Sequence, residues 1–264
     1  MPPLLGSVRR GRGPSVHHFV ARFRHGVPDG QSLLWNPSET STSKPPATMP
    51  FNLILFDLDG TLVDSAPDIA TALNTTLKEA GFPPHPPERV LAYIGDGATK
   101  LVQRALPTVA AVDMDARLVQ RFRSHYADHI CDQSRLYPGV ADLLAHLAPT
   151  TPMAIWTNKP GDLARSLISA LSISHYFRDI IGDGDGFPRK PAVDAGLALI
   201  TRHQTIAANT LFVGDGIPDV HAARALGCRI AAATWGYVPR ATLAAEQPDW
   251  LISSPTDLFD ILSP

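Results

Sequence analysis

Short apolar runs, each followed by small or polar residues, recur along the chain from Phe51 onward. An unbroken run such as residues 53–56 is typical of a strand that is buried on both faces of a sheet. Apolar positions at helical spacing lie between these runs, so strands and helices alternate. This alternation predicts a doubly wound α/β fold, a Rossmann-like parallel sheet covered by helices. The predicted strands are 53–56, 153–157, 211–213, 229–233 and 250–252, and the predicted helices between them are 140–147, 162–171, 192–203 and 218–226.

The segment between the first two predicted strands has no strand pattern. It indicates helices at 67–80, 87–94, 98–106 and 115–130. Pro67 at a first helical position and Gly81 just past a helix end fit the usual start and stop residues. We therefore predict that a helical cap domain, residues 67–135, interrupts an α/β core formed by residues 50–66 and 136–264.

Residues 1–49 differ in composition from the rest of the chain. They contain five arginines but only one aspartate and one glutamate, with many Pro, Gly and Ser residues. Such a stretch buries too little apolar surface to offset its ordering entropy. We expect a disordered extension or residues upstream of a true start at Met49. A transit peptide rich in Arg and Ser, or an arm that binds nucleic acid, is an alternative.

Composition narrows the class of protein. Hydrophobic residues make up 44% of the 264 residues, as in ordinary globular proteins. No apolar run approaches the roughly 18 residues that cross a bilayer, and a net charge of −2 gives no general reason to expect nucleic acid. The only cysteines, Cys131 and Cys228, are too few for a disulfide framework or a zinc site. We therefore expect a cytoplasmic protein with neither a membrane nor a nucleic acid as partner.

Two carboxylates leave the first predicted strand. Asp57 and Asp59 are separated by one residue, and Gly60 permits a sharp turn after them. Buried carboxylates need a cation or hydrogen-bond donors to offset their charge. Ligands of parallel sheets bind beyond the carboxyl ends of the strands. A solvated turn is the alternative, but the preceding apolar strand and the following Gly-Thr-Leu favour a functional site.

Polar residues also follow two later strands. Thr157 and Asn158 offer a hydroxyl and main-chain N–H groups that suit a phosphoryl oxygen, although a Thr/Asn helix cap explains them equally. Asp215 and Asp219 follow the strand at 211–213, within the sequence GDGIPD. An incomplete set of oxygen ligands is what Mg²⁺ prefers, whereas an Asp-Gly turn before a helix is the ordinary alternative.

These motifs, in this order and spacing, resemble those of the haloacid dehalogenase superfamily from residue 53 to about residue 240. The resemblance implies that Asp57 attacks phosphorus and forms an aspartyl-phosphate. Asp59 then protonates the leaving oxygen and later activates the hydrolytic water. Thr157 and Asn158 are implied to bind phosphate, and Lys190 in the sequence RKP to neutralise its charge. A surface role for Lys190, with Lys159 in its place, is the alternative.

The resemblance also implies Mg²⁺ as cofactor. Asp57 and Asp215 supply carboxylates and Asp59 its main-chain carbonyl, while Asp219 supports this metal loop. The chain departs from the family at two places. Gly216 stands where relatives often have Ser, and the glycine lacks one possible hydrogen bond of that serine. Ala192-Val193 follows Lys190-Pro191, where a second Pro is common.

Two further segments, residues 64–68 and residues 93–98, resemble the phosphoglycolate phosphatase branch of the superfamily. This implies hydrolysis of 2-phosphoglycolate to glycolate and phosphate. Gly95 and Gly97 are candidates to direct main-chain N–H groups at the substrate carboxylate, with a plain interhelical turn as the alternative. We expect Asp96 to face away from an anionic substrate.

Other functions stay open at this point. A phosphatase of a sugar phosphate or another small phosphomonoester fits the same motifs, and a phosphomutase shares the core and cap. A non-enzymatic phosphate-binding protein is disfavoured because it has no use for Asp59. The oligomeric state cannot be read from the sequence.

Overall fold

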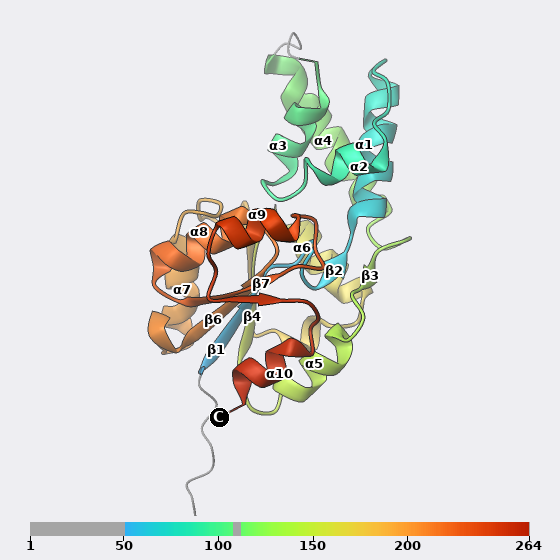
Figure 1. Cartoon of the computed structure of the whole chain (residues 1–264). Coiled ribbons are helices and arrows are strands. Elements are labelled where there is room, and N and C mark those ends of the chain that lie inside the picture. Colours follow the sequence, from blue (N-terminus) through green and yellow to red (C-terminus); the bar gives the residue numbers. More distant parts are fainter. Residues whose placement is uncertain (1–50, 108–111, 264) are drawn as a thin grey trace, which may run out of the picture. The chain divides into compact units, whose positions relative to one another are not determined.

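The computed structural model describes residues 51–107 and 112–263, with the main chain alone for residues 112–115 (Figure 1). The predictions made for residues 1–49 lie outside this part of the chain.

Six strands form one parallel sheet in the order β5-β4-β1-β6-β7-β8. All five predicted strands are present, and the sheet gains a sixth, β5, at the edge next to β4. This arrangement confirms the predicted fold class. The strands are β1 (Leu53–Phe56), β4 (Met153–Pro160), β5 (Asp179–Asp183), β6 (Thr210–Gly214), β7 (Arg229–Ala233) and β8 (Trp250–Ile252).

Helices cover both faces of this sheet (Figure 1). In β1, Leu53 and Leu55 pack into one hydrophobic cluster, together with α7 and α8, while Ile54 and Phe56 pack into another, together with α5, α6 and α10. Burial on both faces explains why the strands are apolar throughout rather than alternating. The helices of the α/β core are α5 (Val140–Leu147), α6 (Gly161–Ala170), α7 (Asp194–Arg202), α8 (Ile217–Leu226), α9 (Arg240–Ala245) and α10 (Asp257–Leu262), with 3₁₀ turns at Ser174–Tyr176 and Ala207–Asn209.

Four helices, here called the helical insert, lie between the first and second strands of the large sheet along the chain. They bury a third hydrophobic cluster of their own, which includes Leu73, Val102 and Phe122. All four predicted helices are present, and the second is shorter than predicted. The division into core and cap domains stays a prediction. The helices are α1 (Ala66–Glu79), α2 (Pro87–Leu91), α3 (Ala98–Ala105) and α4 (Val112–Asp128).

The chain enters and leaves the insert at one place. Two short strands that were not predicted, β2 (Val63–Asp64) and β3 (Arg135–Leu136), pair antiparallel there. Asp68 in the first turn of α1 is buried and accepts hydrogen bonds from the N–H of Gln133 and from the N–H and hydroxyl of Ser134. The two connections between the sheet and the helices are therefore fastened to each other.

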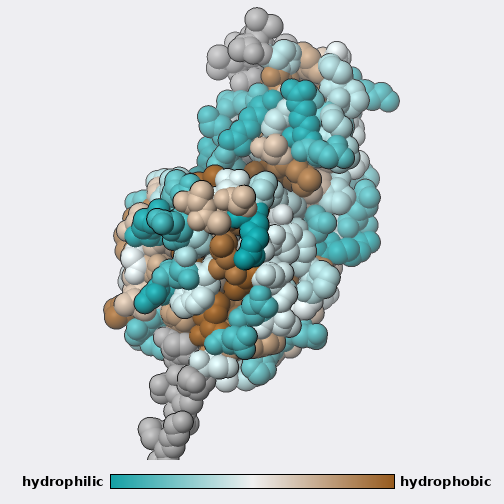
Figure 2. All heavy atoms as spheres, viewed as in Figure 1, coloured by the Kyte–Doolittle hydropathy of each residue, from teal (hydrophilic) through white to brown (hydrophobic). Residues whose placement is uncertain are grey.

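Hydrophilic residues cover most of the face shown in Figure 2, and a hydrophobic strip crosses the part that belongs to the α/β core. Within residues 51–107 and 112–263, none of the helices combines the length and the apolarity that a membrane crossing needs.

Candidate active site

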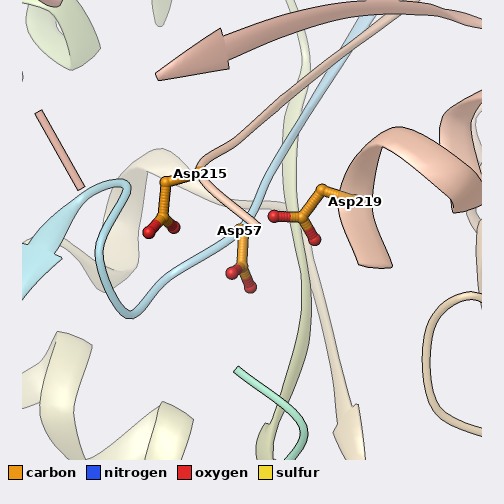
Figure 3. A group of neighbouring side chains, drawn as sticks. All are labelled: Asp57, Asp215 and Asp219. Atoms are coloured by element: carbon orange, nitrogen blue, oxygen red, sulfur yellow. The ribbon is translucent and has the colours of Figure 1, made fainter. Parts of the chain in front are cut away.

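Three buried carboxylates meet at the carboxyl ends of two neighbouring strands (Figure 3). Asp57 follows β1, Asp215 follows β6, and Asp219 lies in the first turn of α8. One oxygen of each lies within 4.8 Å of the others. Strands β1 and β6 pair in parallel, so motifs far apart in the sequence end at the same edge of the sheet.

Asp215 and Asp219 are each held by the loops around them. The Thr61 hydroxyl donates to Asp215 Oδ1 at 2.9 Å, and the N–H of Tyr237 donates to Oδ2 at 2.8 Å. Gly60 has a φ of 85°, and a Cβ there would lie 2.3 Å from Asp215 Oδ2, so the close approach requires glycine. The N–H of Gly216 donates to Asp219 Oδ2 at 2.9 Å. These hydrogen bonds hold the carboxylates of Asp215 and Asp219 in place.

Lys190 is the cation of this group. Its Nζ lies 2.9 Å from Asp57 Oδ1 and 2.7 Å from Asp219 Oδ1, and it donates to the carbonyl of Trp156 at 2.8 Å. Burial lowers the pKa of Lys190, but the charges of Asp219 and Asp57 outweigh burial and raise it overall. Lys190 therefore stays charged next to Asp57, where the sequence predicts the phosphate.

The three carboxylates carry more negative charge than Lys190 offsets. Burial, together with the charges of Asp57 and Asp219, raises the pKa of Asp215 well above its ordinary value. Asp57 Oδ1 is buried, and although Lys190 lies near it, no donor among the residues that the structure describes reaches it with hydrogen-bond geometry. Surplus negative charge and a buried acceptor without a donor are what a hard divalent cation such as Mg²⁺ compensates. The residues present therefore fit the implied cofactor.

Asp59 pairs with a different lysine. Lys159 Nζ donates to Asp59 Oδ1 at 2.9 Å and to Oδ2 at 3.1 Å, and the Ser65 hydroxyl donates to Oδ1 at 2.5 Å. Burial lowers the pKa of Lys159, and the charge of Asp59 offsets only part of this shift. The two lysines that the sequence offered for one role thus lie beside different aspartates.

Thr157 and Asn158 occupy the end of β4 beside Asp57. Both are buried, and the Thr157 hydroxyl accepts a hydrogen bond from the N–H of Lys159 at 3.2 Å. The Asn158 carboxamide donates to the carbonyls of Gly95 and Lys190 and accepts from the N–H of Lys190. Its polar atoms therefore bind the protein itself, linking the insert to Lys190.

A small cavity of about 40 Å³ opens beside Asp57 and Asp59. Thr157 and Asn158 line its core side, and the predicted substrate residues Gly95 and Gly97 line its insert side. Lys190, Asp215 and Asp219 lie outside the lining. The other insert residues that line the cavity are Ile69, Ile94, Ala98, Leu101, Phe122 and Tyr126.

Two core residues donate hydrogen bonds to the loop that contains Gly95 and Gly97. Arg189 donates to the carbonyl of Asp96 at 2.9 Å, and Asn158 donates to the carbonyl of Gly95 at 3.0 Å. The Asp96 carboxylate forms an ion pair with Arg104 on α3, and both side chains are exposed. Its charge is thus partnered at the surface.

Sequence reasoning missed Ser65, Tyr126 and Tyr237. The Tyr237 hydroxyl accepts from the N–H groups of Ser65 and Ala66, and so caps the start of α1 next to Asp59. Ser65 directly follows the first motif, which is a local signal. Tyr126 and Tyr237 have none, because they come from distant segments.

Comparison with known proteins agrees with the fold and the motifs. Residues 54–233 match the model of the haloacid dehalogenase-like hydrolases. A phosphoglycolate phosphatase of Mannheimia succiniciproducens is 37% identical over 221 residues, which cover 80% of this chain and 98% of that protein. A phosphoglycolate phosphatase of Chromobacterium violaceum is 38% identical over 219 residues, with 79% and 95% covered.

Solved structures show the same likeness. The crystal structure of a predicted phosphoglycolate phosphatase from Haemophilus somnus 129PT superimposes with a TM-score of 0.76 at 33% identity, covering 80% of this chain and 98% of that one. The chain belongs to the haloacid dehalogenase-like hydrolase family. Within that family it is a phosphatase, which confirms the predicted enzyme class.

Proposed function

We propose that this phosphatase is Mg²⁺-dependent, acts through a phosphorylated Asp57, and hydrolyses 2-phosphoglycolate to glycolate and phosphate. The observation that carries the proposal is the buried group of Asp57, Asp215 and Asp219 around Lys190, placed at the strand ends beside a small cavity.

In the first step, an Asp57 carboxylate oxygen forms a bond to phosphorus while the bond from phosphorus to the glycolate oxygen breaks. Asp59 gives its proton to that leaving oxygen. Both aspartates line the cavity, so a substrate bound there contacts the nucleophile and the acid together. The Thr157 hydroxyl and the main-chain N–H of Asn158 hold phosphoryl oxygens. Lys190 offsets the charge shared by Asp57 and the phosphoryl group.

In the second step, Asp59 takes a proton from water, which attacks phosphorus and releases phosphate from Asp57. The carboxylates of Asp57 and Asp215 and the carbonyl of Asp59 would hold Mg²⁺, with Asp219 steadying Lys190 and the loop of Gly216. When bound, the cation neutralises negative charge on the phosphoryl oxygens.

The form of the cavity supports a small substrate. Its volume of about 40 Å³ suits a compact molecule, and the side chains that the insert contributes are mostly apolar. A sugar needs several polar partners for its hydroxyls, whereas one carboxylate needs a few N–H donors, such as those near Gly95 and Gly97. The names of the relatives support the same substrate. The cytoplasm stays the proposed location.

The test is a comparison of kcat/KM for 2-phosphoglycolate, hexose phosphates and amino-sugar phosphates at one Mg²⁺ concentration and again with EDTA. We expect 2-phosphoglycolate to be preferred and EDTA to stop hydrolysis. A preference of about tenfold or more for a sugar phosphate would overturn the substrate. Transfer of the phosphoryl group to a sugar hydroxyl, without release of phosphate, would identify a phosphomutase instead.

A further inference from the structure

Lys159 is a buried lysine that the proposed mechanism does not use. It lies in β4, with its side chain 2% exposed, and its Nζ donates three hydrogen bonds. Two go to the carboxylate oxygens of Asp59, and the third goes to the hydroxyl of Tyr126 at 2.7 Å. A lysine ammonium has three donors, so all of its hydrogen-bonding capacity is directed at these two side chains.

Tyr126 holds this ammonium from the side of the insert. It comes from α4 and is buried, and its ring stacks on Phe122 with centroids 5.8 Å apart and planes at 13°. Lys159 Nζ lies 4.3 Å from the centroid of the Tyr126 ring, which adds a cation–π attraction to the hydrogen bond. The position of Lys159 Nζ is therefore set by the insert as well as by β4.

The two oxygens of Asp59 are held unequally. Oδ1 accepts from both Lys159 and Ser65, whereas Lys159 is the one donor that reaches Oδ2 from the described residues. Oδ2 thus keeps the greater capacity to exchange a proton. Because Ser65 holds the other oxygen, the direction in which Oδ2 points depends on Lys159.

We propose that Lys159 is a positioning residue, which aims Asp59 Oδ2 at the reacting oxygen, and that Tyr126 keeps Lys159 in place. The inference rests on the proposed function, in which Asp59 moves the proton in both steps. A plain stabilising ion pair is the competing explanation. The two differ because a misdirected Asp59 harms proton transfer selectively, whereas a weakened ion pair harms the whole site.

Lys159→Met separates these explanations, because it removes the ammonium and nearly keeps the length of the side chain. The substrates are p-nitrophenyl phosphate, whose leaving group needs little protonation, and 2-phosphoglycolate, whose leaving group needs much. We expect steady-state turnover of both to fall about 10- to 100-fold, since hydrolysis of phosphorylated Asp57 needs a correctly aimed base. The rapid first release of p-nitrophenol should stay within about threefold of wild type, because that step depends least on the acid.

The matched control is Lys78→Met, which changes an exposed lysine in α1 and should leave every rate unchanged. Inhibition by inorganic phosphate should be the same in wild type and Lys159→Met, since the phosphate contacts remain. An equal loss of the rapid release and of turnover would overturn the inference, as would turnover at the wild-type rate.

Tyr126→Phe decides the matter if Lys159→Met fails to fold. It keeps the ring and the ion pair and removes one acceptor, so we expect turnover to fall about 2- to 10-fold with the rapid release retained. Unchanged turnover would overturn the inference. Asp59→Asn serves as reference. Full activity of Asp59→Asn would refute the proposed function. If Asp59→Asn is inactive and Lys159→Met is as active as wild type, only the role of Lys159 is refuted.

Discussion

The Asn158 carboxamide pairs with both main-chain polar groups of Lys190, accepting from its N–H at 2.8 Å and donating to its carbonyl at 3.2 Å. The same amide nitrogen donates to the carbonyl of Gly95 at 3.0 Å. Asn158 was predicted to bind phosphate. The contacts of its side chain suggest that its contribution is to place Lys190, with its main-chain N–H left for the phosphate.

Asn158→Asp tests this contribution. The change keeps the acceptor for the N–H of Lys190 but turns a carboxylate oxygen toward two carbonyls. We expect a lower melting temperature and a loss of about tenfold or more in kcat/KM. The two hydrogen bonds that the amide nitrogen donates are lost, and the new carboxylate oxygen repels the two carbonyl oxygens. Asn52→Asp, at an exposed position, is the matched control. Wild-type values for Asn158→Asp would show that the pairing with Lys190 is dispensable.

Asp57→Asn should abolish turnover while the fold persists. An amide oxygen is a poor nucleophile, and the side chain keeps nearly the same volume beside Lys190. The measurement is phosphate release from 2-phosphoglycolate, with circular dichroism to check the fold. Asp142→Asn, an exposed change in the first turn of α5, should behave as wild type. Measurable turnover by Asp57→Asn would exclude the covalent mechanism.

Magnesium should raise the melting temperature, because the cation offsets the mutual repulsion of Asp57, Asp215 and Asp219. At a concentration about 100-fold above Kd, the expected rise is roughly 5 °C or more. Asp215→Asn should lose most of this rise. In EDTA that variant should be more stable than wild type, because it removes a charge that burial and the neighbouring charges of Asp57 and Asp219 make unfavourable, as the raised pKa of Asp215 shows.

Differential scanning fluorimetry with a magnesium titration checks this prediction. Asp260→Asn, at an exposed position of α10, is the control that should respond to magnesium as wild type does. A full magnesium response in Asp215→Asn would place the cation elsewhere.

Cys228 should resist alkylation in the native protein. Burial raises the pKa of its thiol to about 12. At pH 8 only about one thiol in ten thousand is then ionised, and the thiolate is the reactive form. Iodoacetamide labelling followed by mass spectrometry should leave Cys228 unmodified until denaturant is added, with Cys131→Ser giving a single-cysteine protein. Equal labelling with and without denaturant would contradict the packing of Cys228 against α8.

The sequence predicts those parts of the fold that depend on local pattern. The apolar runs predict the strands that are buried on both faces, because the pattern and the burial have the same cause. Strand β5 was missed because its sequence, DIIGD, is short and mixed, and it pairs with β4 alone at the sheet edge. The two-residue strands β2 and β3 are too short for any periodicity.

The motifs likewise predict which strand ends meet, and the structure brings Asp57 and Asp215 together there. Which lysine partners which aspartate is not a local property. Lys159 and Lys190 each precede a proline, and only the packing shows that one contacts Asp59 and the other Asp57. The involvement of Tyr126 also depends on tertiary packing, because α4 has to bring its side chain to Lys159.

Val63 and Leu136 pair with each other, so the helical insert begins and ends at two residues that are neighbours in space. Removing or exchanging everything between them leaves two chain ends that a short hairpin turn can join. The sheet that carries Asp57 and Asp215 has no need to shift its register in response. Recombination at this pair of strands, natural or engineered, can therefore replace the helices of the insert and leave Asp57, Asp215 and Lys190 of the core in place.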